Sequence, residues 1–386
     1  MSRKLDKQAY LALIKPRYQR ASKQVKSQIL DEFCLTCQYN RKYAIWLLKQ
    51  PVRRLSKAKQ KPGPKARYQD EMLVKALERI WYATDLMCSK RLKSAIPHWL
   101  PFYQKHYEPL SKTVQENLLA VSTATIDRLL KPTRDRIDVG RRCGTKPGTL
   151  LRSQIPIRTS CWDIELPGFV EADTVAHCGD SIRGDFAWSL TVTDIKSSWT
   201  EIRAIWNKGA QAVLEQVEDI EAHLPFILRG FDSDNGVEFL NYHLVDYFND
   251  HEPKVQFTRS RPYKKNDNAH VEQKNWTHVR HLFGYARFGK LGVVKRMNEL
   301  YRNEWRLYQN FFMPNLKILE KQRINHRYYK KYHKPLTPCQ RLLDDPYISK
   351  MKKDELIDQY YALDPFELKQ QIDQKKRQIN RFLGLA

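Results

Sequence analysis

Three acidic residues, far apart along the chain, have the surroundings expected of ligands for divalent cations. Asp173 lies within an apolar run, Asp234 lies in the turn sequence SDNG, and Glu272 comes soon after a basic loop. Hard cations such as Mg²⁺ take oxygen ligands and keep several waters, so two or three carboxylates from different elements can hold them. Two such ions about 4 Å apart stabilise both the attacking and the leaving oxygen of a phosphodiester. These acids therefore predict metal-dependent phosphoryl transfer.

The local sequence around each acid explains why it would hold a cation. An unpaired charge in the middle of a buried strand is costly, so Asp173 needs a metal or a cationic partner. Asp234 precedes the pair Asn235-Gly236, which favours a sharp turn at the end of a strand. Glu272 is expected near the start of a helix, where the helix dipole stabilises a negative charge. Each acid thus comes from a separate element.

Each assignment has an alternative in an ordinary structural role. Asp173 could form a salt bridge within the sheet, and Glu272 could be a surface acid of a helix. Asp232 competes with Asp234, because a strand continued to residue 234 would point both side chains the same way. Two further acids are weaker candidates for the same site: Asp180 and Asp194.

The pattern of apolar residues predicts the elements that would position these acids. Three successive strands are expected at 169–177, 186–195 and 200–206, and the short gaps between them make an antiparallel meander. A helix, a buried strand, a helix, a short strand and a long helix follow at 210–224, 226–231, 237–249, 254–258 and 268–283. The order βββαβαβα is that of a ribonuclease-H-like fold, an α/β fold with a mixed sheet and helices on its faces.

The segments DSDNGVEF and SRPYKKNDNAHVEQKN resemble the integrase core that retroviral integrases share with bacterial insertion-sequence transposases. The resemblance covers about residues 155–290. Asp173, Asp234 and Glu272 match the three acids of this DDE family, and the separation of the last two is close to that of the family. The resemblance implies DNA strand transfer, two Mg²⁺ or Mn²⁺ ions held by these acids, and no small-molecule cofactor.

The chain is strongly basic, with 68 Lys and Arg residues against 43 Asp and Glu residues and a formal net charge of +25. Such a surplus predicts a polyanion, DNA above all, as the partner. A group of basic residues adjoins the proposed site, where contacts to DNA phosphates are expected and a solvated surface is the alternative. The group consists of Arg259, Arg261, Lys264, Lys265, Lys274, His278 and Arg280.

Aromatic and histidine side chains near the acids have less specific roles. Tyr263 and Trp276 could stack on a DNA base, although core packing is an equal expectation for Trp276. His177 and His270 flank the acids and could position water or phosphate. Because the three acids suffice without them, neither histidine is assigned a role.

The first 50 residues predict a helix-turn-helix unit. Apolar residues at helical spacing lie on both sides of a polar break, and the second helix, 40–49, would present Arg41 and Lys42 to a DNA groove. A helical hairpin without DNA contacts is the alternative. Cys34 and Cys37 have a zinc-like spacing, but two further ligands are missing nearby, so we expect them to be reduced cysteines of a helix.

Basic linkers rich in Pro or Gly divide the remainder of the chain. Between two of them a second helical DNA-binding unit is predicted, whose last helix has Ser122 as its N-cap, presents Arg128 and ends before Pro132. The predicted divisions are a helix-turn-helix unit (1–50), a linker (51–68), the second helical unit (69–131), a linker (132–154), the catalytic core (155–295) and a basic, mainly helical C-terminal region (296–386).

Composition excludes several other protein classes. No stretch reaches the roughly 18 to 20 apolar residues of a membrane span, and the first residues lack the apolar core of a secretion signal. Seven cysteines at irregular spacings do not predict a disulfide framework. We therefore expect a globular protein of the bacterial cytoplasm that acts at the nucleoid and has no membrane partner.

The combined pattern predicts a transposase or integrase that frees a 3′-hydroxyl at the end of a mobile element by hydrolysis and joins it to target DNA. Holding two element ends together requires self-association, so a homo-oligomer on DNA is expected. A ribonuclease-H-like nuclease that cleaves without joining is one alternative. A DNA-binding regulator without catalysis is another.

Overall fold

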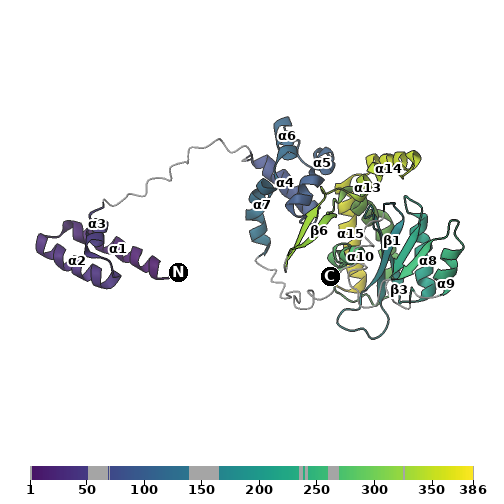
Figure 1. The fold of residues 1–386 in the computed structure, drawn as a ribbon, viewed down its shortest axis with the longest axis horizontal. Coiled ribbons are helices and arrows are strands. Elements are labelled where there is room, and N and C mark those ends of the chain that lie inside the picture. Colours follow the sequence, from purple (N-terminus) through teal and green to yellow (C-terminus); the bar gives the residue numbers. More distant parts are fainter. Residues whose placement is uncertain are drawn as a thin grey trace. The chain divides into compact units, whose positions relative to one another are not determined.

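The computed structural model describes residues 2–50, 68, 70–138, 165–233, 238–239, 242–259, 269–324 and 327–385. The chain divides into two compact units, Met1–Ala66 and Arg67–Ala386 (Figure 1). Within the described residues, no helix is both long enough and apolar enough to span a membrane.

The first unit consists of three helices around a small hydrophobic core that contains the fully buried Phe33. They are α1 (Ser2–Arg20), α2 (Lys23–Cys37) and α3 (Arg41–Lys49). Gln38 ends α2 in a left-handed backbone conformation with φ of 55°. The side chain of Asn40 caps α3 by accepting a hydrogen bond from the backbone N–H of Lys42 at 3.0 Å. The two helices expected on either side of the polar break are thus present.

The second unit is built on a five-stranded mixed sheet with the order β3-β2-β1-β4-β5. Its strands are β1 (Phe169–Ala176), β2 (Ala187–Asp194), β3 (Thr200–Trp206), β4 (Gly230–Ser233) and β5 (Gln256–Arg259). The first three pair antiparallel, whereas β4 is parallel to β1 and β5 is parallel to β4. The antiparallel meander predicted from the alternating pattern is confirmed, with bounds close to those expected.

Helices lie against both faces of this sheet. Helices α8 (Ala210–Ala222) and α9 (Tyr242–Asn249) cover one face, against an apolar layer that includes Val170 and Ala172 (Figure 1). Because side chains alternate between the faces of a strand, Glu171 and Asp173 leave β1 on the opposite face. That face carries α10 (Ala269–Lys274), the π-helix η1 (Asn275–Arg280), α11 (His281–Phe283), α12 (Val293–Leu300) and the π-helices η2 (Tyr301–Trp305) and η3 (Tyr308–Phe312).

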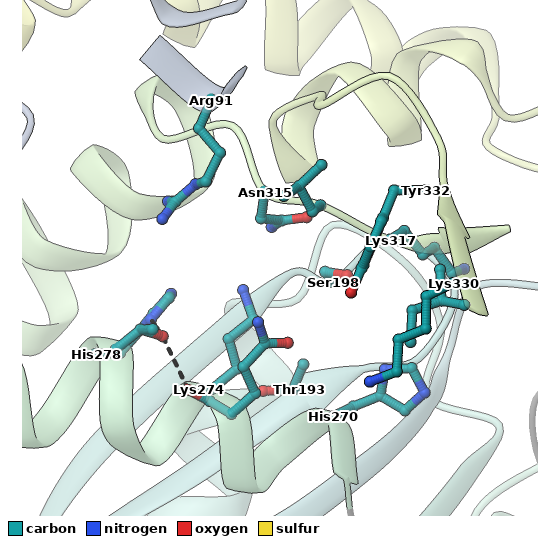
Figure 2. A pocket seen from close by; sticks show the side chains of 14 residues that line it. Arg91, Thr193, Ser198, His270, Lys274, His278, Asn315, Lys317, Lys330 and Tyr332 are labelled. Carbon is teal, nitrogen blue, oxygen red and sulfur yellow. Dashed lines mark hydrogen bonds between the residues drawn. The ribbon is translucent and has the colours of Figure 1, made fainter. Parts of the chain in front are cut away.

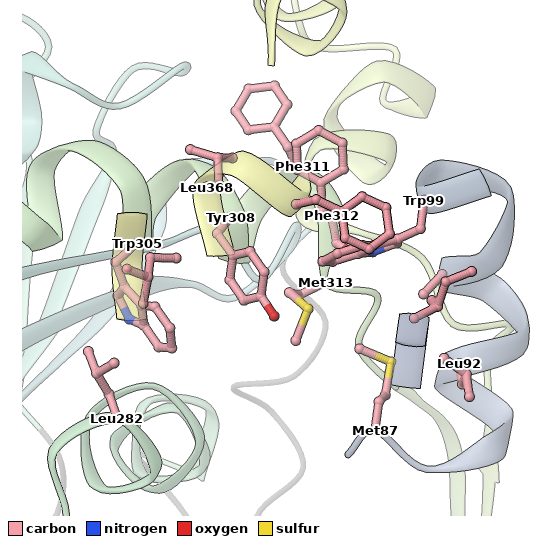
Figure 3. Close-up of a cluster of buried hydrophobic side chains, with 14 of the residues drawn as sticks. Met87, Leu92, Trp99, Leu282, Trp305, Tyr308, Phe311, Phe312, Met313 and Leu368 are labelled. Atoms are coloured by element: carbon pink, nitrogen blue, oxygen red, sulfur yellow. The ribbon is translucent and has the colours of Figure 1, made fainter. Parts of the chain in front are cut away.

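A second group of helices packs against the C-terminal region in one hydrophobic cluster. Trp99 lies beside Phe312 in this cluster (Figure 3). It is fully buried, its ring centre lies 4.9 Å from that of Phe366, and its Nε1 donates to the carbonyl of Phe312 at 3.2 Å. Residues 70–138 thus share a core with the C-terminal helices. The helices involved are α4 (Glu71–Ala83), α5 (Ser89–His106), α6 (Lys112–Ala120), α7 (Thr123–Asp138), α13 (Pro338–Asp344), α14 (Lys350–Ala362) and α15 (Pro365–Leu383).

The prediction that Pro132 ends a helix is wrong, because α7 continues to Asp138. Proline inside a helix removes one backbone hydrogen bond and costs stability. The next residue offsets part of this cost, since Thr133 is buried and its hydroxyl donates to Glu78 on α4. The predicted start of the helix is confirmed, because Ser122 Oγ accepts a hydrogen bond from the backbone N–H of Thr125 at 3.2 Å.

Two other predicted elements need correction. The strand expected at 226–231 is β4, which begins only at Gly230. Leu228, which is buried as a strand residue would be, lies in an irregular segment before it. The C-terminal region expected to be mainly helical also contains a two-stranded hairpin, β6 (Ile318–Ile324) and β7 (Arg327–Tyr332). The two strands contain two isoleucines and three tyrosines, and β-branched and aromatic residues favour strands over helices.

Candidate active site

Four carboxylates from three elements gather on the face of the sheet that α10 covers. Glu171 and Asp173 lie two residues apart on β1, which places them about 7 Å apart along one face of the strand. Asp232 lies opposite Glu171 in the register of the parallel strands β1 and β4, so its side chain leaves the same face. Glu272 lies on α10. The topology therefore concentrates acidic groups between the sheet and this helix.

Glu171 fastens the start of α10 to the sheet. Its side chain is 3% exposed, and its Oε2 accepts hydrogen bonds from the backbone N–H groups of His270 at 2.9 Å and Val271 at 3.0 Å. Burial raises the pKa of Glu171 to about 8, and the charges of Asp232 and Glu272 contribute in the same direction. Asp232 and Glu272 are therefore close enough to Glu171 for their charges to act on it.

Asp173 is held by the same helical segment that carries Glu272. Asn275 Nδ2 donates to Asp173 Oδ2 at 2.7 Å, and the backbone N–H of Thr174 donates to the other carboxylate oxygen, also at 2.7 Å. Asn275 lies three residues after Glu272, close to one helical turn. Asp173 and Glu272 thus face a common region, one from the sheet and the other from the helix.

The second acid of the proposed triad is only partly described. Asp232 is half-buried, and its Oδ1 accepts a hydrogen bond from the Thr258 hydroxyl on β5 at 2.7 Å. Asp234 lies outside the described residues, so the choice between these two aspartates stays a prediction. Glu238, from the same motif, is buried and binds Lys208 and the Thr174 hydroxyl, which is a structural role.

The donor set of the site fits hard divalent cations, since each group is a carboxylate and a cation would relieve the repulsion among them. Within the described residues, one set of three potential ligands has its ligand atoms within 4.8 Å of one another, namely His106, Asp364 and Glu367. The four acids of the candidate site are more widely spaced than this set. In that set Asp364 caps α15 and lies 3.0 Å from His106 Nε2. Its contacts therefore explain it as a helix cap.

The remaining acids and histidines singled out from the sequence have structural positions. Asp194 is 1% exposed and accepts hydrogen bonds from the backbone N–H groups of Ser197 and Gly168, and Asp180 is exposed in the loop after β1. His177 is fully buried, lies 2.8 Å from the hydroxyl of Ser189, and burial lowers its pKa to about 3. It is a neutral core histidine at physiological pH.

The predicted DNA contacts differ in their environment. Arg41 pairs with Asp31 at the surface of the first unit, Arg128 bonds the Thr125 hydroxyl on α7 at 3.0 Å, and Arg280 lies 4.7 Å from the ring centre of Tyr285. Lys42 is exposed at the start of α3. Four of the predicted contacts lie outside the described residues, namely Arg261, Tyr263, Lys264 and Lys265, as does the side chain of Arg259.

Lys274 is buried although it is charged, and Trp276 is exposed although it is aromatic. Lys274 is only 6% exposed, and burial lowers its pKa to about 7, with Arg341 and Arg91 contributing in the same direction. Trp276 is 55% exposed and lies outside the hydrophobic clusters of the described residues, so core packing does not explain it. His278, by contrast, is buried, and burial lowers its pKa.

Comparison with protein-family profiles gives no match. The chain is 38% identical over 330 residues to the uncharacterized protein y4rM of Sinorhizobium fredii, an alignment that covers 84% of this chain and 91% of that protein. The chain belongs to the y4rM family. Among solved structures, the catalytic core domain of BIV integrase is matched over 45% of this chain and 91% of that domain, with 13% sequence identity and a TM-score of 0.29. A TM-score this low does not establish a shared fold.

One residue of the site in this y4rM-family chain was not recognised from the sequence. Glu171 is two residues before Asp173, and the period of a strand puts both on one face. The sequence VEAD carried that signal, but an acid in a strand gives no sign that it will cap a helix 99 residues further along. Only the packing of α10 on β1 reveals this contact.

Proposed function

We propose that this chain is a DNA transposase or integrase of the DDE type, which hydrolyses a phosphodiester at the end of a mobile element and joins the freed 3′-hydroxyl to target DNA. The observation that carries the proposal is the group of carboxylates from β1, β4 and α10, in which Asp232 lies opposite Glu171 in the strand register and Glu171 accepts two hydrogen bonds from the helix that carries Glu272. Gathering like charges in a partly buried place is costly unless cations bind there. We therefore assign the group to metal-dependent phosphoryl transfer.

In this proposal Asp173, Asp234 and Glu272 hold two Mg²⁺ or Mn²⁺ ions. When bound, these ions would activate the attacking oxygen and stabilise the leaving oxygen. Asp234 directly follows Ser233, the last residue of β4, and the proposal requires its carboxylate to lie beside that of Asp173. Asp232, on the same strand, is the alternative second acid.

Two neighbouring residues would keep these acids in position. Glu171 anchors the first turn of α10 and so fixes the backbone that carries Glu272. Asn275 donates to Asp173 Oδ2 and so fixes the orientation of that carboxylate. Glu171 and Asn275 are thus assigned as positioning residues rather than as ligands.

The strand order β3-β2-β1-β4-β5 supports a ribonuclease-H-like fold for the core. An antiparallel meander followed by two parallel strands is what the predicted order βββαβαβα would form. In this arrangement β1 and β4 are neighbours, so acids on these two strands are brought side by side. The fold assignment therefore accounts for why residues so distant in sequence would share one site.

DNA is the proposed substrate and partner. The net charge of +25 favours a polyanion, and the exposed basic residues of α3 could contact the ends of the element. We propose that Arg41 and Lys42 contribute to this end recognition, that the basic loop at 259–265 and Arg280 contact the reacting strand, and that Arg128 contacts adjacent DNA. Holding two ends at once would require a homo-oligomer.

A joining assay tests this proposal. The full-length chain is incubated with Mg²⁺, target DNA and a duplex taken from the DNA that flanks the gene, and the products are resolved on a denaturing gel. Wild type should give joined products, whereas Asp173→Asn and Glu272→Gln should lower their yield roughly 10³-fold, because several kcal/mol of transition-state stabilisation are lost. The exposed Asp180→Asn serves as the matched control and should retain activity.

Three outcomes of this assay would overturn the proposal. Cleavage without joining would favour a nuclease, and DNA binding without any metal-dependent reaction would favour a regulator. Full joining by either acid variant would remove that residue from the site.

A further inference from the structure

A cavity of about 390 Å³ lies beside α10 on the β2 side of the sheet. Thr193 of β2 lines it, whereas Asp232 lies on β4, and β1 separates these two strands. The other walls come from α5, from α10 and η1, and from the segment around the β6–β7 hairpin. The cavity is therefore distinct from the group of acids, although both adjoin the same helix.

Four cationic side chains from distant parts of the chain line this cavity, and Figure 2 shows them around a common space. They are Arg91 of α5, Lys274 of α10, and Lys317 and Lys330 on either side of the hairpin. None of the described residues in its lining is acidic. We call this set the cation pocket.

Lys274 is the most buried of the four cations. It is 6% exposed, and within the described part of the chain its ammonium group takes part in no hydrogen bond or ion pair. A buried charge without a partner costs several kcal/mol, so proteins rarely retain one without a ligand or a function. Lys274 therefore indicates that a negative charge from outside the chain completes the pocket.

Two of the other cations, Arg91 and Lys317, are held in place by backbone carbonyls, which leaves their charges uncancelled. Arg91 Nε donates to the carbonyl of Pro314 at 2.6 Å, and Lys317 Nζ donates to the carbonyl of Lys196 at 2.8 Å. Asp194 acts electrostatically on Lys317, but that carboxylate already accepts three hydrogen bonds. The pocket is thus a preformed set of donors with a net positive charge.

We propose that the cation pocket binds a phosphate group of the DNA backbone. Arginine and lysine are the usual partners of phosphate oxygens, and Gln273 and Thr277 add polar groups to the same wall. Lys330 and the 44% exposed Tyr332 leave the rim open to solvent, which suits one phosphate of a long strand better than an enclosed small anion. The choice of DNA as the source of the phosphate rests on the proposed function.

The test measures DNA binding by the full-length chain in EDTA, so that catalysis plays no part. Lys274→Met and Lys330→Met are compared with wild type and with Lys295→Met, an exposed lysine of α12 that does not line the pocket. We expect about tenfold weaker binding of a fluorescent duplex for Lys274→Met, since a charged hydrogen bond is lost. The slope of log affinity against log salt should also fall by about 0.9, as expected for one phosphate contact.

The outcomes separate the two sources of phosphate. Weaker binding and a smaller salt slope for Lys274→Met and Lys330→Met, but not for Lys295→Met, support a DNA phosphate. Unchanged affinity and slope in both pocket variants overturn the proposal. If inorganic phosphate raises the melting temperature of wild type but not of Lys274→Met while DNA binding is unchanged, the pocket serves a free anion and the DNA assignment is wrong. If the pocket binds DNA as proposed but the wild-type chain joins no DNA, the proposed function of the acids is wrong and the cation pocket is not.

Discussion

Helix α10 separates two regions of opposite charge. Towards β1 and β4 it adjoins carboxylates, and Glu171 accepts hydrogen bonds from its first turn. Towards β2 and the hairpin it adjoins the cation pocket, where Lys274 is buried among other cations. Both regions carry like charges that cost stability when the protein is alone. The comparison teaches that each region is built for a partner of the opposite charge, metal cations on one side and phosphate on the other.

The two regions also differ in how they are held together. The acids sit on adjacent strands and on a helix that is hydrogen-bonded to them, so hydrogen bonds preorganise them. The pocket brings α5 together with the segment that leads into β6. There Arg91 bonds Pro314, which lies 223 residues further along the chain. The pocket therefore depends on the packing of α5 and the hairpin against the sheet and α10, whereas the acids depend on one sheet and one helix.

The largest expected effect concerns the second acid of the site. Asp234→Asn should lower the yield of joined DNA roughly 10³-fold, because a metal ligand loses its charge. Asp232→Asn should lower it less than about tenfold, since in our proposal that residue only borders the site. Comparing initial rates of the two variants decides between them, and the reverse ranking would make Asp232 the ligand.

The next effect concerns the anchor of α10. Glu171→Ala removes the acceptor for two backbone N–H groups and should slow joining about 10- to 100-fold, as for other residues that orient ligands. Glu171→Gln keeps an acceptor oxygen and should restore most of the rate. Joining rates across a range of Mg²⁺ concentrations provide the measurement. Equal rates for Glu171→Ala and wild type would show that Glu171 does not position the site.

Protein without metal and DNA should show opposite pH dependences on the two sides of α10. The pKa of Glu171 is raised from 4.5 to about 8, so its contribution to stability is full below pH 4.5 and is lost as pH rises through 8. The pKa of Lys274 is lowered from 10.5 to about 7, so its contribution is present above pH 10.5 and is lost as pH falls through 7.

Urea denaturation of the single variants measures these contributions. Lys274→Met should raise the free energy of unfolding by roughly 3 kcal/mol at pH 6, and the gain should shrink towards pH 10. In wild type, the contribution of Glu171 to the free energy of unfolding should fall as pH rises from 4.5 to 8, and Glu171→Gln should remove this pH dependence. If Lys274→Met destabilises the protein at pH 6, the buried ammonium has a compensating partner and the comparison fails.

The smallest effect is expected at the exposed indole of η1. Trp276→Ala should weaken DNA binding by about tenfold or less, since stacking on one base contributes roughly 1–3 kcal/mol. Because Trp276 is 55% exposed, its removal should leave the melting temperature nearly unchanged. Unchanged DNA affinity with a lower melting temperature would instead indicate a packing role.

Much of the core could be predicted because its signals are local. The meander follows from alternating residues at 187–194 and 200–206, and the helix that carries Glu272 follows from its apolar spacing. Local apolar content gave a wrong strand start where tertiary packing buries residues outside regular elements. Leu228 is buried from an irregular segment and so resembled a strand residue.

The relations between distant residues could not be predicted in the same way. Glu171 becomes an anchor only because α10 lies over β1, and Lys274 becomes a pocket residue only because α5 and the hairpin enclose it. A basic residue on a predicted helix gives no indication of whether it will be exposed. Lys274 and Arg280 are both basic residues of the helix predicted at 268–283, yet only Lys274 is buried.

The most direct test of the central claim is a crystal structure of the full-length chain soaked with Mn²⁺, with the ions located by anomalous scattering. The account predicts two peaks between β1, β4 and α10, with carboxylate oxygens of Asp173, Asp234 and Glu272 at roughly 2.0 to 2.2 Å. Crystals that bind Mn²⁺ elsewhere, or that hold one of these three carboxylates away from the other two, would contradict it.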